Sequence, residues 1–304
     1  MRRGEMMTAG IGEALALGSA ATWAVGMILA RQLGATLPPL ALNLLKNGLV
    51  LLVLVPLAML FSAGPWPQLS ASELAWVLLS GVIGIAVADT LYFRALNELG
   101  AGRMGIIGNL YSPLVLVLGF LFLDERLGLQ QWLGFGLVGM GVLLVSKPRR
   151  EWKTQPAHTL RGVLFGMLAI ALMAVAIVMV KRILETQPLL WITALRLGGA
   201  VGGLALLAAL PAMRHRVAFD RHRVPWGRLV VAALVGQGLS MVLWLGGYKY
   251  TSASVAAILN ESASVFLVVL AALWLREPLG RRAFFGVLLT FSGIACMLLG
   301  RATP

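Results

Sequence analysis

The sequence contains two related stretches, DERLGLQQWLG at residues 124–134 and REPLGRRAFFG at residues 276–286. At a constant spacing of 152 residues, a glutamate, a leucine and two glycines coincide. Four earlier pairs coincide at a spacing of 150 residues: Gly12 with Gly162, Pro38 with Pro188, Lys46 with Arg196, and Gly48 with Gly198. An acid, a proline and a cation in register favour an internal repeat over a chance match. We therefore expect two related units, residues 1–150 and 151–304.

The composition places both units in a lipid environment. The 304 residues are 59% hydrophobic and only 12% charged, and the mean hydropathy is +0.88. This charge content is about half that of a soluble domain, and it excludes a disordered chain, a coiled coil and an ordinary soluble enzyme. So many apolar side chains need a bilayer as their solvent.

Ten apolar runs are long enough for transmembrane helices, which need about 20 residues each. The first run follows Arg2 and Arg3 as a signal peptide does, but Glu13 and the nine later runs favour a retained helix. The expected fold class is an all-α integral membrane protein with ten transmembrane helices. The runs are 12–31, 38–60, 73–96, 101–123, 129–146, 160–180, 188–210, 227–249, 252–275 and 282–300.

Each unit holds five of these runs, and five is an odd number. The second unit therefore begins on the opposite side of the membrane, which makes the two units an inverted repeat. Inverted repeats are the usual architecture of secondary transporters, because rocking one unit against the other exposes a central site to each side in turn. The repeat thus predicts transport by alternating access.

The excess of positive charge, +13, lies mostly in the connecting segments. Seven Lys and Arg residues fall on the side of the termini and sixteen on the other side. The positive-inside rule places the richer side in the cytoplasm and both termini outside. We interpret the excess as a topology signal and a contact with anionic lipid headgroups, not as a nucleic-acid site. The lone Cys296 excludes an intrachain disulfide.

Four charged residues lie within the predicted spans: Lys46, Asp89, Arg196 and Glu261. A charge in the hydrocarbon costs at least about 2.5–3.5 kcal/mol, so each is expected to face a cavity or a partner. One interpretation is that they pair with each other and hold the units together. The other is that Lys46 or Arg196 faces a substrate carboxylate, while Asp89 or Glu261 faces an amine or a proton. A zwitterionic substrate suits the second interpretation.

The eighth run carries a polar and aromatic stripe made by Gln237, Ser240, Met241, Trp244 and Tyr248, which share one helical face. Such a stripe suits a cavity lining on which a flat substrate stacks, although helix packing around a buried amide explains it equally well. Glycines four residues apart at 198–203 indicate close helix packing. The expected cavity residues are Trp23, Asn43, Lys46, Asp89, Tyr92, Asn109, Tyr111, Arg196, Gln237, Trp244, Asn260 and Glu261.

Other motifs carry no chemistry. Gly134-x-Gly136-x-x-Gly139 matches a dinucleotide fingerprint, but it lies within an apolar span without a preceding strand. The three histidines lie in connecting segments, which argues against a metalloprotease or a hydrolase in the membrane. We expect no catalytic residues, no metal and no cofactor, and hence no enzyme.

Together these residues resemble the drug/metabolite transporter superfamily, specifically its EamA family of ten-helix exporters. The resemblance covers nearly the whole chain. It includes Trp23 in the first helix, Lys46 and Arg196 in the second and seventh, the run Asp89-Thr-Leu-Tyr-Phe-Arg-Ala-Leu, the corner Leu99-Gly100-Ala101, and the acidic corners before the fifth and tenth helices. Where the family usually has Glu-Pro in the fourth helix, this chain has Asn109-Leu-Tyr-Ser-Pro113, and it has Asn260-Glu261 in the ninth.

The resemblance implies a basket-shaped fold with a central cavity in a bacterial inner membrane. It implies export of small organic metabolites, and similarity to the YddG-type branch implies amino acids, including aromatic ones. Sugars, nucleosides, choline or drugs are the alternative substrates, and a membrane enzyme or a sensor is the alternative class. Protons are the expected candidate for a coupling ion, and both monomer and homodimer remain open. Family members are often drawn with both termini inside, which differs from the count of cations.

Overall fold

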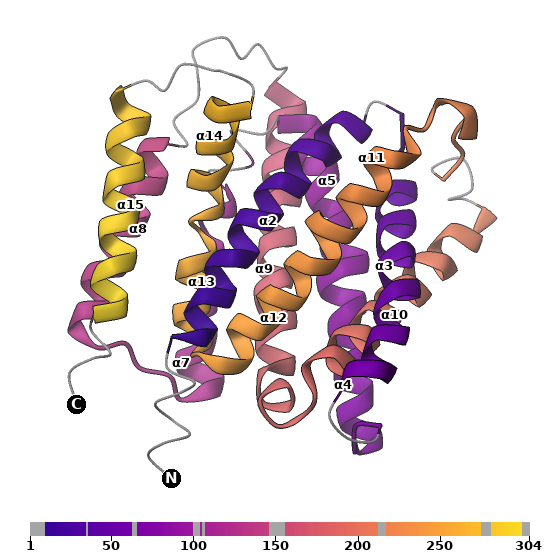
Figure 1. The fold of residues 1–304 in the computed structure, drawn as a ribbon. Helices are drawn as coiled ribbons and strands as arrows, with labels where there is room; N and C mark the ends of the chain where they lie inside the picture. Colours follow the sequence, from indigo (N-terminus) through magenta and orange to yellow (C-terminus); the bar gives the residue numbers. More distant parts are fainter. Residues whose placement is uncertain are drawn as a thin grey trace.

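The computed structural model describes residues 10–34, 36–62, 66–99, 104, 107–145, 156–211, 217–274 and 281–299. Within these ranges the protein is a bundle of helices without strands (Figure 1). The start of the fourth predicted run and the corner at 275–280 lie outside the described residues, as do 146–155 and 212–216.

The helices follow each other in two sets of five. The first set is α2 (Ile11–Leu33), α3 (Pro39–Phe61), the continuous α4–η1–α5 (Ala71–Gly81, Val82–Val87, Ala88–Leu99), α7 (Tyr111–Leu123) and α8 (Leu129–Val145). The second set is α9 (Pro156–Thr186), α10 (Leu189–Ala209), the continuous α11–η4–α12 (Trp226–Val231, Ala232–Leu239, Ser240–Tyr250), the pair α13 (Ala253–Asn260) and α14 (Ala263–Trp274), and α15 (Arg281–Leu299). A short turn of 3₁₀ helix, η3 (Arg221–Arg223), precedes α11.

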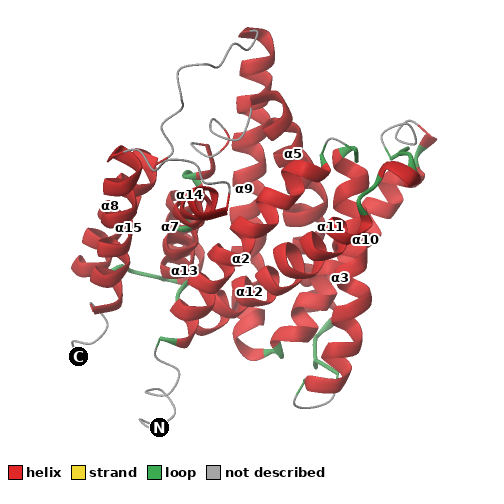
Figure 2. Cartoon of the chain, turned by 45° about the horizontal axis from the view of Figure 1, so that its top comes forward, coloured by secondary structure: helices red, strands yellow, loops and turns green. Residues whose placement is uncertain are grey.

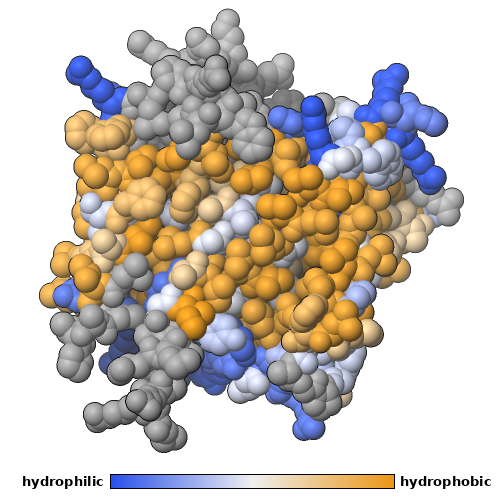
Figure 3. All heavy atoms as spheres, viewed as in Figure 1, coloured by the Kyte–Doolittle hydropathy of each residue, from blue (hydrophilic) through white to orange (hydrophobic). Residues whose placement is uncertain are grey.

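The predicted fold class is confirmed. Six helical stretches are long and apolar enough to cross a membrane, and four shorter apolar helices occupy the places of the other predicted spans. Apolar side chains form a broad band over the visible face, with hydrophilic patches above and below it (Figure 3). The protein is therefore a multi-pass membrane protein. The sixth span is longer than the predicted 160–180, since α9 covers Pro156–Thr186.

The fourth and ninth predicted spans are each interrupted by a turn, which the sequence analysis did not predict. A turn at Asn109 and Leu110 precedes α7, and a turn at Glu261 and Ser262 separates α13 from α14. Pro113 accounts for the first break, because its ring excludes the carbonyl four residues earlier from a helical hydrogen bond. At the second break the backbone tightens to bonds spanning three residues, such as Ser262 N–H to the Leu259 carbonyl at 3.2 Å.

The third and eighth spans each contain a π-helical segment that the sequence did not predict. These segments, η1 and η4, begin at Val82 and Ala232, which are 150 residues apart, the spacing that relates Lys46 to Arg196. A π segment widens the helix and leaves carbonyls without their usual partners. In η1 the Asn43 side chain of α3 donates to the Ile85 carbonyl at 3.1 Å, so an amide from a neighbouring helix supports the irregular turn.

The two sets of helices interlock. In the first set, α2 and α3 pack against η4 of the second set, and in the second set α9 and α10 pack against η1 of the first. The helices α8 and α15 form a separate pair at one side of the bundle (Figures 1 and 2). Helices of both sets therefore surround the centre of the molecule.

Glycines allow this interlocking. Gly26 of α2 and Gly236 of η4 meet backbone to backbone, and Gly199 of α10 meets the backbone of Leu78. Gly81 lies against the carbonyl oxygen of Arg196, so a Cβ there would overlap it. Of the predicted glycine motif at 198–203, only Gly199 and Gly203 face another helix among the described residues, and Gly198 has open space.

We expect Gly81→Ala to destabilise the fold by roughly 1–3 kcal/mol, because the added methyl group pushes α4 away from the Arg196 backbone. Gly198→Ala is the matched control on the facing helix and is expected to be neutral or stabilising by up to about 1 kcal/mol. Thermal unfolding of the detergent-solubilised protein, followed by fluorescence-detected size exclusion, measures both. Equal behaviour of the two variants would contradict the close approach.

Candidate functional site

A central cavity of about 270 Å³ lies where the two sets of helices interlock. Its walls come from α2, α3, η1 and α5, α7, α9, α10, η4 and α12, and the α13–α14 junction. Eleven of the twelve predicted residues line it: Trp23, Lys46, Asp89, Tyr92, Asn109, Tyr111, Arg196, Gln237, Trp244, Asn260 and Glu261. Asn43 does not line it, because its fully buried side chain is turned toward η1. Their part in substrate binding stays a prediction.

The charged residues of the cavity differ in how they are paired. Lys46 and Asp89 form an ion pair with 3.9 Å between Nζ and Oδ2. The Lys46 ammonium also lies 5.2 Å from the centre of the Phe93 ring, within the range of a cation–π contact. Of the four charged residues in the spans, Lys46 and Asp89 therefore pair with each other.

Arg196 forms no ion pair in the part of the chain that the structure describes. Arg196 is 1% exposed, and its Cζ lies 5.4 Å from the centre of the Trp244 ring. Gly84 faces the guanidinium, and a Cβ there would lie 3.2 Å from Nη2. Nε and Nη1 find no hydrogen-bond acceptor within the described part of the chain. A buried donor without an acceptor costs about 1–3 kcal/mol, and more when charged, so Arg196 is poised to bind an anionic group.

Glu261 occupies the break between α13 and α14. Its Oε1 accepts hydrogen bonds from the Ser112 hydroxyl and from the Ser112 backbone N–H, the latter at 3.3 Å. Ser112 is in the first turn of α7, where backbone N–H groups lack helical partners. The carboxyl group thus caps α7 from the opposite set of helices. Among the described residues Glu261 forms no ion pair.

Three amide side chains add donors and acceptors to the lining. The Asn260 amide nitrogen donates to the Ala256 carbonyl at 2.8 Å. The Asn109 amide nitrogen is buried, and no described residue accepts a hydrogen bond from it. Gln237 projects from η4 and is 9% exposed. The cavity therefore offers free polar groups beside its charged ones.

Aromatic rings form much of the remaining surface. Trp23 is the most open of them, with 37% of its surface exposed. Trp244 meets Tyr248 edge to face, with 5.1 Å between ring centres. The Tyr248 hydroxyl in turn lies 2.8 Å from the Tyr111 hydroxyl, which joins α12 to α7. Tyr248 is fully buried behind the cavity wall and does not line it.

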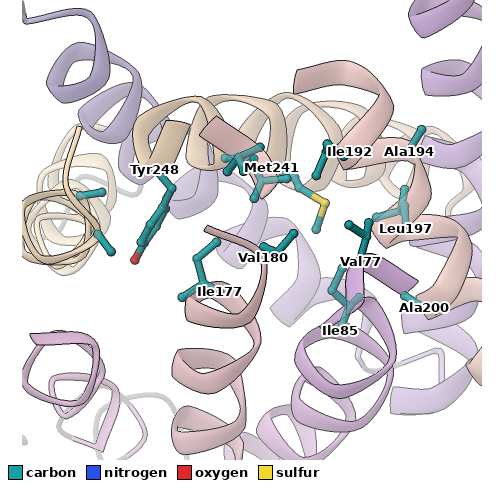
Figure 4. Packing of buried hydrophobic residues seen from close by; sticks show 14 of the residues in the cluster. Val77, Ile85, Ile177, Val180, Ile192, Ala194, Leu197, Ala200, Met241 and Tyr248 are labelled. Atoms are coloured by element: carbon teal, nitrogen blue, oxygen red, sulfur yellow. The ribbon is translucent and has the colours of Figure 1, made fainter. Parts of the chain in front are cut away.

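The cavity lies toward one end of the bundle. Ala30, three residues before the end of α2, and Leu42, three residues after the start of α3, both line it. At the other end the space is filled by an apolar cluster that includes Ile177, Val180 and Tyr248 (Figure 4). The route through the protein is therefore closed on the side of the α2 N-terminus.

Polar contacts hold the closed end together, and the sequence reasoning missed their central residue, Glu125. Its carboxylate accepts from the backbone N–H groups of Ala253 and Ser254, at 2.6 and 2.9 Å, and from the Ser254 hydroxyl. It therefore caps α13. Nearby, Lys249 donates to three carbonyls at the end of α9, including that of Gln187. The signal that could have identified Glu125 is its place in the acidic corner that recurs at Glu277 in the second half of the sequence.

Part of the discounted glycine run has a structural role. Gly134, and Gly141 just beyond the fingerprint, lie in α8 against α15, where a Cβ at Gly134 would overlap Met297 and one at Gly141 would overlap Thr290. Close packing explains these two positions, whereas Gly136 and Gly139 have open space. In the ranges that the structure describes, His, Cys, Asp and Glu form no group suited to a metal ion.

Comparison with known proteins gives a consistent result. The profile of the EamA-like transporter family matches residues 10–147 and again residues 160–299. A protein of Sinorhizobium sp described as an uncharacterized transporter in the cobO 3' region is 32% identical over 102 residues, which are 32% of this chain and 70% of that protein. An uncharacterized transporter of Methanothermobacter thermautotrophicus is 23% identical over 224 residues, 74% of this chain and 62% of that protein.

A solved crystal structure also resembles the chain. It superposes with a TM-score of 0.77 at 18% identity, and the match covers 96% of this chain and 98% of the other. At this identity the likeness shows the fold alone.

Access to the cavity is testable with single cysteines in a Cys296→Ser background. Ser264→Cys places a thiol on the cavity wall, and Ser80→Cys places one at a fully buried site outside it. We expect a small water-soluble thiol reagent to modify the first at least about tenfold faster, because the second reacts only through local opening. Mass spectrometry of the purified variants measures the rates. Equal, slow rates would show that the cavity is closed to water.

Proposed function

Because this chain belongs to the EamA-like transporter family, we propose that it exports small organic metabolites, with amino acids, including aromatic ones, as its substrates. The observation that carries this proposal is the buried Arg196 guanidinium: the residue lines the cavity, and its Nε and Nη1 have no hydrogen-bond acceptor among the described residues. A planar fork of N–H groups suits a carboxylate, because two parallel hydrogen bonds form at once.

The distribution of charge favours Arg196 over Lys46 as the carboxylate-binding residue. Lys46 forms an ion pair with Asp89 at 3.9 Å, whereas Arg196 forms no ion pair with any described residue and lies against the face of Trp244. A substrate carboxylate would supply the missing acceptors and the missing negative charge. The substrate's amino group would then face an acid of the same cavity, Asp89 or Glu261.

The size and surface of the cavity support a small, partly apolar substrate. Its volume of about 270 Å³ is at or below the lower end of the range for drug-sized ligands. Trp23, Tyr92 and Trp244 present aromatic surface beside the polar groups. Aromatic side chains stack against such surface with about 0.5–1.5 kcal/mol beyond the gain from burial.

Transport follows from the arrangement of the two sets of helices, taken as repeats 1–150 and 151–304. Rocking one repeat against the other would open the apolar cluster near Tyr248 and close the end near Ala30 and Leu42. The cation-rich side of the chain is the side on which the cavity lies, so the positive-inside rule puts this conformation open to the cytoplasm. We place the protein in the inner membrane of a bacterium, as a monomer or a homodimer.

Counterflow in proteoliposomes tests the substrate class. We expect saturable exchange of amino acids, and we expect Arg196→Ala to lower it roughly 10- to 100-fold, because hydrogen bonds to a charged group contribute about 1.5–3 kcal/mol. Arg196→Lys should restore little of the exchange, since an ammonium group lacks the planar fork of N–H donors that a guanidinium has. Arg228→Ala, at an exposed site on α11, is the control. Full exchange by Arg196→Ala would refute the assignment, and exchange of sugars or nucleosides alone would replace the substrate class.

Trp244→Leu separates aromatic from aliphatic substrates. We expect it to lower the exchange of phenylalanine relative to alanine by about three- to tenfold, because the ring contact is worth about 0.5–1.5 kcal/mol. Trp226→Leu, 45% exposed on α11 and outside the cavity, should leave the ratio unchanged. Competition between the two labelled amino acids measures the ratio. An unchanged ratio in Trp244→Leu would place the aromatic side chain elsewhere.

A further inference from the structure

We propose that Glu261 is the proton-binding residue that couples transport to a proton gradient, and that the proton and the cationic group of the substrate occupy its carboxyl group in turn. This inference rests on the proposed function and adds the source of energy to it. The sequence left two acids open for this role, Asp89 and Glu261, and the structure distinguishes them.

Among the described residues, the surroundings of Glu261 provide hydrogen bonds but no ion pair. The residue is 9% exposed, and one oxygen, Oε1, accepts both bonds from Ser112. The residue is also part of the cavity wall. The carboxyl group therefore meets the cavity while its other contacts are neutral donors.

The helices packed against α13 and α14 carry the ionisable groups Glu13 and Arg31 on α2, Tyr111 on α7, Tyr248, Lys249 and Tyr250 on α12, and Arg281, Arg282 and Cys296 on α15, while α8 and the two helices themselves carry none. Arg281 and Arg282 are exposed at the start of α15, and Tyr250 is exposed at the end of α12. Tyr111 and Tyr248 bind each other, and Lys249 binds carbonyls of α9. Glu13 lies in the first turn of α2 and accepts from the Thr251 hydroxyl at 3.2 Å. Arg31 is two residues before the other end of α2. Across the cavity, Lys46 and Asp89 form an ion pair, and Arg196 forms none with Glu261 among the described residues.

Whether the Glu261 carboxyl group is protonated depends on the balance between the cost of removing its charge from water and the gain from its hydrogen bonds. Removing a carboxylate from water costs several kcal/mol even after the protein relaxes. The N-terminus of α7 and the two Ser112 donors return only part of this cost. The balance favours the protonated acid when the cavity holds no cation. An ammonium group beside Glu261 reverses the balance, because an ion pair in a low-dielectric site gains more than the same pair in water.

Asp89 lacks this dependence on the substrate. Lys46 supplies its counter-charge from within the protein at 3.9 Å, so its ionised form is supported whether or not the cavity is occupied. Its charge therefore does not need to change during transport. Glu261 is the acid whose charge must be matched by something that enters and leaves.

The resulting cycle balances protons and charge. When the substrate binds, its ammonium group displaces the proton of Glu261, which passes to water on that side. After the protein reorients, the substrate leaves and a proton from the second side returns to the carboxylate. One proton thus crosses for each substrate that moves the opposite way, and with a zwitterionic substrate each cycle moves one positive charge.

An infrared measurement tests the proton without any substrate. We expect the purified full-length protein in lipid nanodiscs at neutral pH to show the C=O stretch of a protonated carboxylic acid. Glu261→Gln should abolish this band. Asp89→Asn should leave it, and so should Glu125→Gln, the matched control in which the other glutamate that caps a helix is changed. A band that survives Glu261→Gln, or that is lost in Asp89→Asn, would overturn the proposal.

A transport measurement tests the coupling, with L-phenylalanine as the probe. We expect an imposed pH gradient to drive phenylalanine uphill in wild-type proteoliposomes while protons move the opposite way. Glu261→Gln should lower this accumulation roughly tenfold or more and retain phenylalanine exchange, because only the link between the two ligands is lost. Glu125→Gln should retain both.

The two measurements separate the possible failures. Gradient-driven accumulation by Glu261→Gln equal to that of the wild type would refute the role of Glu261 in coupling. If the two Gln variants lose accumulation and exchange together, Glu261 is a structural cap like Glu125, which also overturns the proposal. If wild-type protein exchanges none of the amino acids, the proposed substrate class fails, and the infrared band still decides whether Glu261 holds a proton.

Discussion

A backbone N–H group inside a bilayer has no water to bind, and the centre of this protein is built around that constraint. The half-helices α7 and α13 lie side by side, and each begins without the preceding turn that would satisfy its first N–H groups. The N-terminus of α7 is capped by Glu261, directly after the end of α13, and the N-terminus of α13 is capped by Glu125, two residues after the end of α7. Two reciprocal contacts therefore join the two sets of helices: one lies where the fourth and ninth spans are broken, and the other lies at the closed end, where α7 ends and α13 begins.

The two buried cations, Lys46 and Arg196, are accommodated in different ways. Arg196 remains buried because two glycines of the third span leave room for it: Gly81 for its backbone and Gly84 for its guanidinium. Lys46 lies in the corresponding place of the first repeat and is neutralised by Asp89. One of the two equivalent cations is thus paired within the protein, and the other is the one that we propose binds a substrate. The two halves of the inverted repeat therefore differ in charge pairing at this point.

Much of the fold was predictable from the sequence, because hydropathy and length alone set where a helix crosses a bilayer. Eleven cavity residues were also predictable, since a charged or aromatic residue in the middle of a span has few alternatives to a cavity. The helix breaks and the π segments were not predictable. They depend on contacts between residues far apart in the chain, such as Asn43 with Ile85 and Ser112 with Glu261. Hydropathy averages over such positions, and Asn43 was misplaced for this reason.

The apolar cluster below the cavity has a consequence for the membrane as a whole. Ile177, Val180 and Leu245 are fully buried around the joined hydroxyls of Tyr111 and Tyr248. A constriction of this kind is hard to wet, and ions cannot cross it without losing their hydration. The cluster therefore prevents ions from leaking through the protein. It lets a cell keep a hollow, charged protein in its membrane without draining the voltage on which its other transporters depend.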